Sequence, residues 1–561
     1  MKLIPIRLCR ATCSLPGPNG RRYLPRIMCH SRIACVALLV AVGCRPATAP
    51  VPVPVARPVM KAALPAVPLV AGPLAPKVVY PRADQLIQST DSNFILGSIG
   101  NGRATLTING APVRVWPNGS FLGWVSNPPP TAPFYELVTA VGTDTVRATH
   151  PVRVAGMMPP VPDSLRPPPN VVTDTTPTWV VLGVGDTAYA LPDTDRVVIG
   201  RPGPNTVYRW FLLPGTRVQL TARYPGFARV RLDSALQIWV EAVDAKTFAT
   251  DSIPPIRVAR NSRVRSDTGW SDLIIPISER PAFFVEERDR SLDLTLYDTR
   301  SSTDQVNYPS TDSLIRHVEW AAERSDRVRY SVRLSQEPYG YLVFYENGAL
   351  VLRVRRQPSR VGKPPAGIST LPPPTPLTGL TIAVDPGHPP GGAVGPTGLT
   401  EPDAVLPVGF ALKRILESRG AKVVMTRSTR DAVDLQIRAV IARRAGAHAF
   451  VSLHYNAYGD GINPLIQLNG TEVYFYRPHS ELLARAVQSR MAAYQPLPDQ
   501  GVYYRSLAVV RTPWMPAILA EGGFMMVPEQ ENAMKTPEFQ ERYARAVADG
   551  LEAYFRGLRA P

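Results

Sequence analysis

The sequence predicts a multidomain protein in which two or three all-β modules precede a C-terminal α/β domain, a mixed sheet covered by helices. Three observations support this fold class. The chain of 561 residues is far too long for a single hydrophobic core. Its 61 prolines gather in clusters that separate the periodic segments. Near residue 380 the pattern changes from short alternating strands to strands that alternate with amphipathic helices.

Residues 1–44 have the features of an export signal. All five cysteines lie here, so the body of the chain can form no disulfide and no thiolate metal site. A basic start and an apolar run from Ile33 lead to Gly43 and Cys44, a pattern that resembles a lipoprotein cleavage box with Cys44 as the acylated residue. Plain secretion and a membrane anchor are the alternatives, although the apolar run is too short to span a bilayer. Met28 is an alternative start of translation.

This signal predicts a periplasmic protein of the cell envelope, anchored through a lipid on Cys44, with the outer membrane favoured over the inner one. The formal net charge is +17, and removal of residues 1–43 would lower it by seven because they hold seven Lys or Arg and no acid. A basic surface suits a polyanion. For an exported protein the available polyanion belongs to the envelope, so we expect no nucleic-acid partner.

Proline clusters and turn signals set the module boundaries. Ten of the 37 residues in 45–81 are proline, which predicts a polyproline-like linker without helix or strand. Asn-Gly turn signals within 82–157 favour an immunoglobulin-like sandwich. The division that follows is a signal (1–44), a linker (45–81), an Ig-like β-sandwich (82–157), a linker (158–177), a small β-barrel-like module (178–250), a β-rich module (265–357), a Pro-rich linker (358–379) and the α/β domain (380–558).

The α/β domain alternates apolar strands with amphipathic helices. Its predicted strands are 380–385, 422–426, 449–453, 471–476, 507–510 and 516–520. Its predicted helices are 403–418, 432–445, 480–494 and 537–555. This is the part of the chain in which we expect catalysis.

Three polar side chains follow the most apolar strands of this domain. His388 follows one strand, His454 the second and Glu521 the third, so they should meet at one edge of the sheet. Glu401, after a loop rich in glycine and proline, can fold back over that edge. Two imidazoles and a carboxylate with an open position are typical of catalytic zinc. Taken singly, each histidine could be a hydrogen-bonded scaffold residue and Glu401 a helix first-turn acid.

Six motifs then occur in order: "VDPGH" (384–388), Glu401 opening a helix, "SLHYNA" (452–457), "GTEVYF" (470–475), "LAVVRTPWMPAILAEGGF" (507–524) and "FQERYARAVADGLEAYF" (539–555). Together they resemble the zinc-dependent N-acetylmuramoyl-L-alanine amidases over about a third of the chain. The resemblance implies that His388, Glu401 and His454 bind Zn²⁺ and that Glu521 is the catalytic carboxylate. The chain departs from the family pattern at Pro389 and Pro390, where glycines are usual, and at Arg443, where asparagine is common.

The implied reaction is hydrolysis of the amide bond between N-acetylmuramic acid and L-alanine in peptidoglycan. Asn456 and Arg505 are candidate substrate-binding residues, with a loop cap and a solvated charge as their structural alternatives. Residues 265–357 resemble the AMIN modules that dock amidases on peptidoglycan, and the β modules could bind septal or envelope partners. Residues 477–506 leave little room for an inhibitory helix, so we expect an open site. The alternatives are a zinc carboxypeptidase or endopeptidase of the wall and a non-catalytic peptidoglycan-binding protein.

Overall fold

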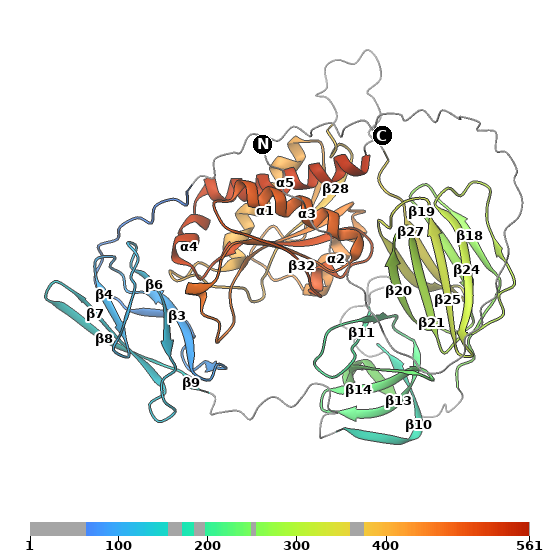
Figure 1. The fold of residues 1–561 in the computed structure, drawn as a ribbon, viewed down its shortest axis with the longest axis horizontal. Helices are drawn as coiled ribbons and strands as arrows, with labels where there is room; N and C mark the ends of the chain where they lie inside the picture. The colour runs from blue at the N-terminus through green and yellow to red at the C-terminus, as the bar shows by residue number, and fades with distance from the viewer. Residues whose placement is uncertain (1–62, 155–170, 184–196, 248–253, 360–374, 560–561) are drawn as a thin grey trace, which may run out of the picture. The chain divides into compact units, whose positions relative to one another are not determined.

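A computed structural model describes the protein over residues 63–154, 171–183, 197–247, 254–359 and 375–559 (Figure 1). The predicted signal with Cys44 and most of the two later linkers lie outside these residues. Every described residue falls within one unit of the chain, Pro58–Pro561. None of the helices in the described part combines the length and apolar character that crossing a bilayer requires.

The first β module packs two antiparallel sheets, β1-β3-β6 and β5-β4-β7-β8, around a shared core. Ile95 and Phe121 come from one sheet and Leu106 and Leu137 from the other, and all four are buried. The strands are β1 (Lys77–Tyr80), β2 (Leu86–Ile87), β3 (Ser92–Ser98), β4 (Thr105–Ile108), β5 (Ala111–Val113), β6 (Ser120–Ser126), β7 (Phe134–Val141), β8 (Asp144–Pro151) and β9 (Arg153–Val154). A sandwich was expected here, but it begins earlier than the sequence predicted.

The end of the predicted linker 45–81 is part of this sandwich. Lys77–Tyr80 is strand β1 and pairs antiparallel with β3, so the prediction that the segment forms no strand is wrong at this end. The sequence KVVY lies between two prolines but contains none, and therefore its N–H groups are free to pair. Its β-branched valines also favour an extended backbone.

The second module is an open five-stranded sheet, β15-β14-β13-β10-β16, with the hairpin β11-β12. The described strands form an open sheet order; the barrel-like expectation for residues 178–250 stays a prediction, because part of that range lies outside the described residues. Strand β10 begins at Val172, within the predicted linker 158–177, because Thr and Val there continue the strand pattern. The elements are β10 (Val172–Leu182), β11 (Val198–Gly200), β12 (Trp210–Leu212), β13 (Arg217–Tyr224), β14 (Phe227–Asp233), β15 (Leu236–Glu241), η1 (Ala242–Asp244) and β16 (Ala245–Thr247).

The third module again consists of two sheets, β23-β18-β19-β27-β26 and β20-β21-β25-β24, with the short pair β17-β22. Strictly alternating side chains, such as Leu292, Leu294 and Leu296 on β21, fill its core. The strands are β17 (Val258–Ala259), β18 (Ser262–Ser266), β19 (Trp270–Pro276), β20 (Ala282–Arg288), β21 (Ser291–Tyr297), β22 (Arg300–Ser301), β23 (Val306–Asn307), β24 (Ile315–Arg324), β25 (Arg327–Leu334), β26 (Tyr341–Glu346) and β27 (Ala349–Arg355).

The C-terminal domain is built on a six-stranded mixed sheet of order β29-β28-β30-β33-β31-β32. All neighbouring pairs are parallel except β31 and β33. The strands are β28 (Thr381–Pro386), β29 (Lys422–Met425), β30 (Ala449–Asn456), β31 (Thr471–Phe475), β32 (Asp499–Tyr504) and β33 (Ala517–Phe524). The mixed sheet predicted from the sequence is therefore present.

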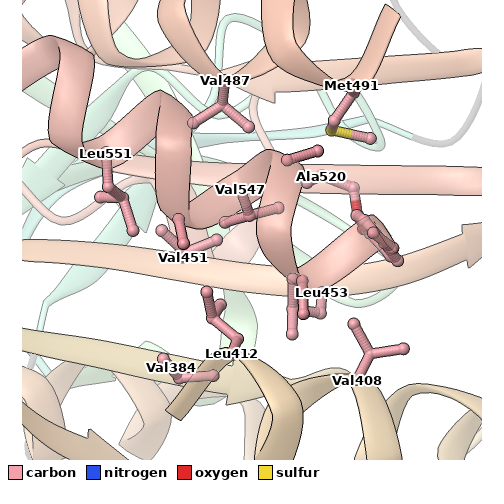
Figure 2. Packing of buried hydrophobic residues seen from close by; sticks show 14 of the residues in the cluster. Val384, Val408, Leu412, Val451, Leu453, Val487, Met491, Ala520, Val547 and Leu551 are labelled. Atoms are coloured by element: carbon pink, nitrogen blue, oxygen red, sulfur yellow. The ribbon is translucent and has the colours of Figure 1, made fainter. Parts of the chain in front are cut away.

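Helices cover both faces of this sheet because its four central strands, β28, β30, β33 and β31, are largely buried on both sides. Val384 and Val451 point to the face covered by α1, α3 and α5, and Figure 2 shows them packed against Leu412, Val547 and neighbouring side chains. Helix α2 and η4 pack on the opposite face, as their shared core cluster shows. The helices are α1 (Glu401–Ser418), α2 (Leu435–Arg444), η2 (Pro464–Ile466), η3 (Pro478–Ser480), α3 (Glu481–Tyr494), η4 (Ala508–Val510), α4 (Pro528–Met534) and α5 (Pro537–Arg559).

One predicted strand of this domain is wrong. Residues 507–510 were expected to be a strand, but Ala508–Val510 is the short helix η4. The edge strand is instead β32 at Asp499–Tyr504, which the sequence analysis did not identify. A four-residue apolar run cannot be assigned to strand or helix from periodicity alone.

Candidate active site

The candidate site lies at the carboxyl ends of three neighbouring parallel strands, β28, β30 and β33. His388 follows β28 by two residues, and His454 and Glu521 lie on β30 and β33 as directly paired residues. Parallel strands present their carboxyl ends at one sheet edge, and the strand-end rule predicts a ligand site there. The structure thus brings together the side chains that the sequence singled out at strand ends.

His388, Glu401 and His454 form one cluster. One ligand atom from each lies within 4.8 Å of the other two. His454 Nδ1 is 2.8 Å from Glu401 Oε1, and His388 Nε2 is 3.3 Å from Glu401 Oε2. The two imidazole rings stand nearly perpendicular, at 81°, with centroids 5.0 Å apart. Three donors that converge from three segments of chain are the arrangement expected of a metal site.

Glu401 is buried at the first turn of α1, with only 3% of its surface exposed. Its Oε2 accepts a hydrogen bond from Ala393 N at 2.8 Å, and its Oε1 accepts one from Tyr455 N at 3.2 Å. Burial raises the pKa of this carboxyl, but the hydrogen bond and positive charge of His454 and the charge of His388 outweigh burial and hold the pKa below its usual value. Glu401 is therefore fixed as a carboxylate beside two imidazoles.

The loop before Glu401 is held by Glu531, a buried residue of α4. Glu531 Oε1 accepts hydrogen bonds from Thr397 N at 3.1 Å, Thr397 Oγ1 at 2.7 Å and Leu399 N at 3.3 Å. A carboxylate that accepts several backbone and hydroxyl donors fixes the path of a loop. This interaction turns the loop back toward the sheet edge, where Glu401 begins its helix.

A buried ionic network supports the loop that carries His388. Asp385 accepts hydrogen bonds from Arg438 Nη1 at 2.7 Å and from Ser452 Oγ at 2.6 Å. Arg438 Nη2 in turn donates to the carbonyl oxygens of His388 at 3.2 Å and of Pro389 at 2.8 Å. Both partners of the ion pair are almost fully buried. Arg438 thus fixes the backbone at His388 and Pro389.

Glu521 lies in the same site, and its Oε2 has no hydrogen-bond partner among the described residues. Its Oε2 is buried, and no donor in the described part of the chain reaches it. Burial raises the pKa of Glu521 well above its usual value, and the negative charges of Glu401 and Glu472 add to this effect. Glu472 is directly opposite Glu521 on the antiparallel strand β31. A buried carboxyl left unpaired at a site is a candidate for proton transfer.

The two predicted substrate-binding residues differ in position. Asn456 lines the cavity at the site, and its amide donates to Glu472 Oε1. Arg505 follows β32 with its side chain exposed and its guanidinium 5.8 Å from the Tyr474 ring centroid. It is not among the residues that line the cavity. The structure therefore brings Asn456 to the site and leaves Arg505 outside its lining.

The site opens into a cavity of about 790 Å³ that is lined by His388, Glu401, His454 and Glu521 together. Two imidazole nitrogens and one carboxylate oxygen are the donor set of a three-ligand catalytic zinc site, and so the residues fit that metal. Glu521 supplies a second feature of a hydrolytic site, a carboxyl with an unpaired oxygen in the same cavity as the three donors. This arrangement can activate a water molecule for hydrolysis.

Sequence reasoning missed the supporting residues, namely Glu472, Asp385, Arg438 and Glu531. Asp385 lies inside the "VDPGH" motif, so its position directly before the strand end was a usable signal. Arg438 and Glu531 lie on helices far along the chain from the residues that they hold, at separations of 53 and 134 residues in their closest contacts. No local pattern marks such long-range partners.

The fold and the site define a class: a metal-site hydrolase with an α/β domain whose His-Glu-His cluster lies beside a buried acid. Residues 382–553 match the family model described as N-acetylmuramoyl-L-alanine amidase. Through this domain the chain belongs to the N-acetylmuramoyl-L-alanine amidase family, whose named relatives are cell-wall amidases.

Two curated relatives and one solved structure illustrate the likeness. The N-acetylmuramoyl-L-alanine amidase LytC of Bacillus subtilis (strain 168) is 32% identical over 187 residues, which cover 32% of this chain and 36% of LytC. The uncharacterized protein YqiI of the same strain is 31% identical over 186 residues, which cover 32% of this chain and 87% of YqiI. The structure of AmiC2 of Nostoc punctiforme is 36% identical and covers 32% of this chain and 97% of that chain, with a TM-score of 0.29. This chain thus spans about a third of the length of LytC.

Proposed function

We propose that this protein is a zinc-dependent amidase that cleaves the bond between N-acetylmuramic acid and L-alanine in peptidoglycan. The observation that carries the proposal is the convergence of His388, Glu401 and His454 within 4.8 Å, beside the unpaired oxygen of Glu521. Family membership supports the substrate class. The network of Asp385 and Arg438 holds the backbone that carries His388 in place before any ligand binds.

The two imidazoles and Glu401 would hold the zinc ion, and all three side chains line the cavity. The chemistry that zinc supplies when bound is Lewis-acid activation of water and of the scissile carbonyl. The protein's own part begins with Glu401, which His454 and two backbone donors fix in one orientation. A fixed carboxylate binds without the entropic penalty of ordering a free side chain.

Glu521 carries the proton transfers. Its unpaired Oε2 accepts a proton from the attacking water, since no other donor in the described chain competes for that oxygen. The water oxygen bonds to the lactyl carbonyl carbon, the carbon–nitrogen bond breaks, and Glu521 returns the proton to the departing amine of L-alanine. Burial favours the protonated form of Glu521. The leaving amine must therefore be more basic than the Glu521 carboxylate in order to take the proton from it.

We extend the proposal to the location of the protein. The lipoprotein-like signal with Cys44, and the net charge of +10 that is left when the seven cationic residues of 1–43 are removed from +17, support an envelope enzyme, periplasmic and lipid-anchored, that works on an anionic wall. The module of residues 265–357 would hold the enzyme on peptidoglycan, as an AMIN-like module does. Radiolabelled palmitate incorporated into the wild-type protein but not into Cys44→Ala would support the anchor; equal labelling would refute it.

The test of the activity uses purified full-length protein and purified peptidoglycan, with the products read by mass spectrometry. We expect intact stem peptides that begin with L-alanine, loss of release with a chelator, and recovery with Zn²⁺. Glu521→Gln should retain zinc yet lose activity by at least about 100-fold. Fragments cut within the stem peptide would favour a carboxypeptidase or endopeptidase, and binding without any release would favour a non-catalytic wall protein.

We also propose that the site is open without an activator. In the described structure, residues 477–506 form η3, helix α3 and strand β32, which belong to the sheet and its cover. The full-length zinc-loaded protein should therefore release peptide from purified sacculi without any added partner. If the protein released no peptide until a partner was added, this part of the proposal would be wrong.

A further inference from the structure

The cavity at the candidate active site has a second wall that does not belong to the amidase domain. Besides the four site residues, its lining includes Val79, Tyr80, Arg82, Gln85 and Phe94 from the first β module. Tyr80 and Phe94 stack there with ring centroids 4.8 Å apart. Residues that precede the amidase match by about 300 positions thus help to shape the site.

This wall is fastened to the chain that leaves strand β30. Asp460 Oδ1 accepts hydrogen bonds from Tyr80 Oη at 2.6 Å and from Asn93 Nδ2 at 2.9 Å, and its Oδ2 accepts one from Gln88 N at 3.1 Å. Gly461 N donates a further hydrogen bond to Asn93 Oδ1 at 3.0 Å. Three hydrogen bonds to one carboxylate and a fourth beside it make a specific attachment rather than an incidental one.

An apolar cluster continues the attachment. Phe94, Leu96 and Trp116 of the first module share a buried core with Phe524 and Met526, which end strand β33 and follow it. Strand β33 also carries Glu521, so the β module packs against the same strand that supplies the catalytic acid. A buried apolar core between modules stabilises one arrangement of the two walls.

Arg82 is the only lysine or arginine in the lining of this cavity within the described structure. Its side chain is exposed and makes no hydrogen bond or ion pair with another described residue, although Asp84 also lines the cavity. Its backbone is fixed, because Arg82 N donates to Gln85 Oε1 at 3.0 Å and Arg82 O accepts from Gln85 N at 3.0 Å. A free guanidinium on a fixed turn suits a carboxylate ligand.

Resting on the proposed function, we propose that the first β module is a substrate-binding wall in which Arg82 binds the free carboxylate of the stem-peptide residue that follows L-alanine. That residue is a γ-linked glutamate in peptidoglycan, so its α-carboxylate stands close to the scissile bond. Arg82 and the His-Glu-His cluster share one cavity, which is large enough for a muropeptide. Arg82 is thus a specificity residue. It favours peptidoglycan in which the glutamate α-carboxylate is free over peptidoglycan in which that carboxylate is amidated.

The experiment compares two soluble substrates, an N-acetylmuramoyl tripeptide with the free α-carboxylate and the same tripeptide amidated at that position. Full-length zinc-loaded protein is used as wild type, Arg82→Ala, Arg82→Glu and Arg147→Ala; Arg147 is an exposed arginine on β8, outside the cavity lining. We expect Arg82→Ala to lower kcat/KM on the free acid about tenfold and on the amide at most about twofold. Arg82→Glu should reverse the preference, and Arg147→Ala should match the wild type.

The outcomes separate this inference from the proposed function. Release of peptide by the wild type, with equal losses on both substrates or no loss in Arg82→Ala, would overturn the role of Arg82 and leave the amidase activity intact. No release by the zinc-loaded wild type on either substrate would overturn the proposed function and this inference with it. The zinc content and the unfolding midpoint of each variant are measured as controls, and both should match the wild type if the exposed substitutions leave the fold unchanged.

Discussion

Gly387 and His454 lie in direct contact across neighbouring strands, because a Cβ placed on Gly387 would be 2.2 Å from His454 Cε1. Real Cβ atoms essentially never lie within 3.0 Å of another heavy atom. Gly387 N also donates to Leu453 O at 2.9 Å, so the backbone cannot move away without losing that bond. The absence of a side chain at Gly387 lets the loop with His388 approach the strand with His454.

Gly387→Ala should therefore displace the His454 ring and weaken metal binding. We expect a lower zinc content and a loss of kcat/KM on the order of 100-fold, since a displacement of about 1 Å is enough to misplace a reacting group. The matched control is Gly557→Ala on α5, where a Cβ meets nothing within 4 Å. Elemental analysis and peptide release measure the two effects, and normal zinc content in Gly387→Ala would contradict the contact.

Arg438→Leu should both destabilise the domain and loosen the His388 loop. Removing the cation leaves Asp385 buried without its partner, which costs about 3 to 5 kcal/mol of unfolding free energy. Arg545→Ala removes an exposed arginine paired with Glu541 and should cost at most about 0.5 kcal/mol. Urea unfolding of both variants measures the difference, and equal small changes would show that the buried pair contributes little.

His448 makes the stability depend on pH. Burial, with the nearby charge of Arg355, lowers the pKa of His448 to about 4 in the folded protein, whereas an unfolded histidine has a pKa of about 6.5. Between these values the unfolded chain binds a proton that the folded chain excludes, so the free energy of unfolding falls as pH falls from 6.5 to 4, by up to roughly 3 kcal/mol. Above pH 6.5 the residue contributes no slope.

The check is urea unfolding of the wild type and His448→Asn at several pH values between 4 and 8. Asparagine keeps an acceptor for Thr381 N, which donates to His448 Nδ1 at 3.0 Å, but cannot be protonated in this range. The variant should lose stability less steeply than the wild type on acidification. Parallel curves for the two proteins would remove His448 from this role.

Asp460→Ala should release the first β module from the amidase domain while each keeps its own core. Tyr80, Asn93 and the Gln88 amide lose their shared acceptor, which costs roughly 1 to 3 kcal/mol. Hydrogen exchange should speed up at residues 88–93 and 457–462, and peptide release should fall if the module is a wall of the site. Asp144→Ala, at an exposed hairpin of the same module, is the control, and unchanged exchange in Asp460→Ala would contradict the attachment.

The ligand cluster could be predicted from the sequence because its information is local. Each apolar strand ends in a polar side chain, and the geometry of parallel sheets alone brings His388, His454 and Glu521 to one edge. The loop to Glu401 is rich in glycine and proline, so its return to the edge could also be inferred. Local sequence patterns were enough to predict which residues meet wherever the parallel sheet itself sets the distance between them.

The remaining features depend on partners far along the chain. Strand β1 was assigned to a linker because proline content dominated the local pattern, whereas its pairing with β3 decides the outcome. Arg505 follows the edge strand β32 and is exposed outside the cavity lining, although its charge acts on Glu521 and Glu472, so its role in binding substrate stays a prediction. The β module itself was expected, but its position beside the site had no signal in the sequence, since Asp460 and Tyr80 are separated by 380 residues.

The apolar contact around Phe524 and Met526 has a practical consequence for handling the enzyme. Phe524 is 1% exposed and Met526 is 1% exposed in the whole protein, and part of their cover comes from Phe94 and Leu96. A fragment of residues 375–559 would expose those side chains to water as an apolar patch beside strand β33, which carries Glu521. Such a fragment should self-associate or need detergent, although the family match alone would suggest it as the natural piece to express.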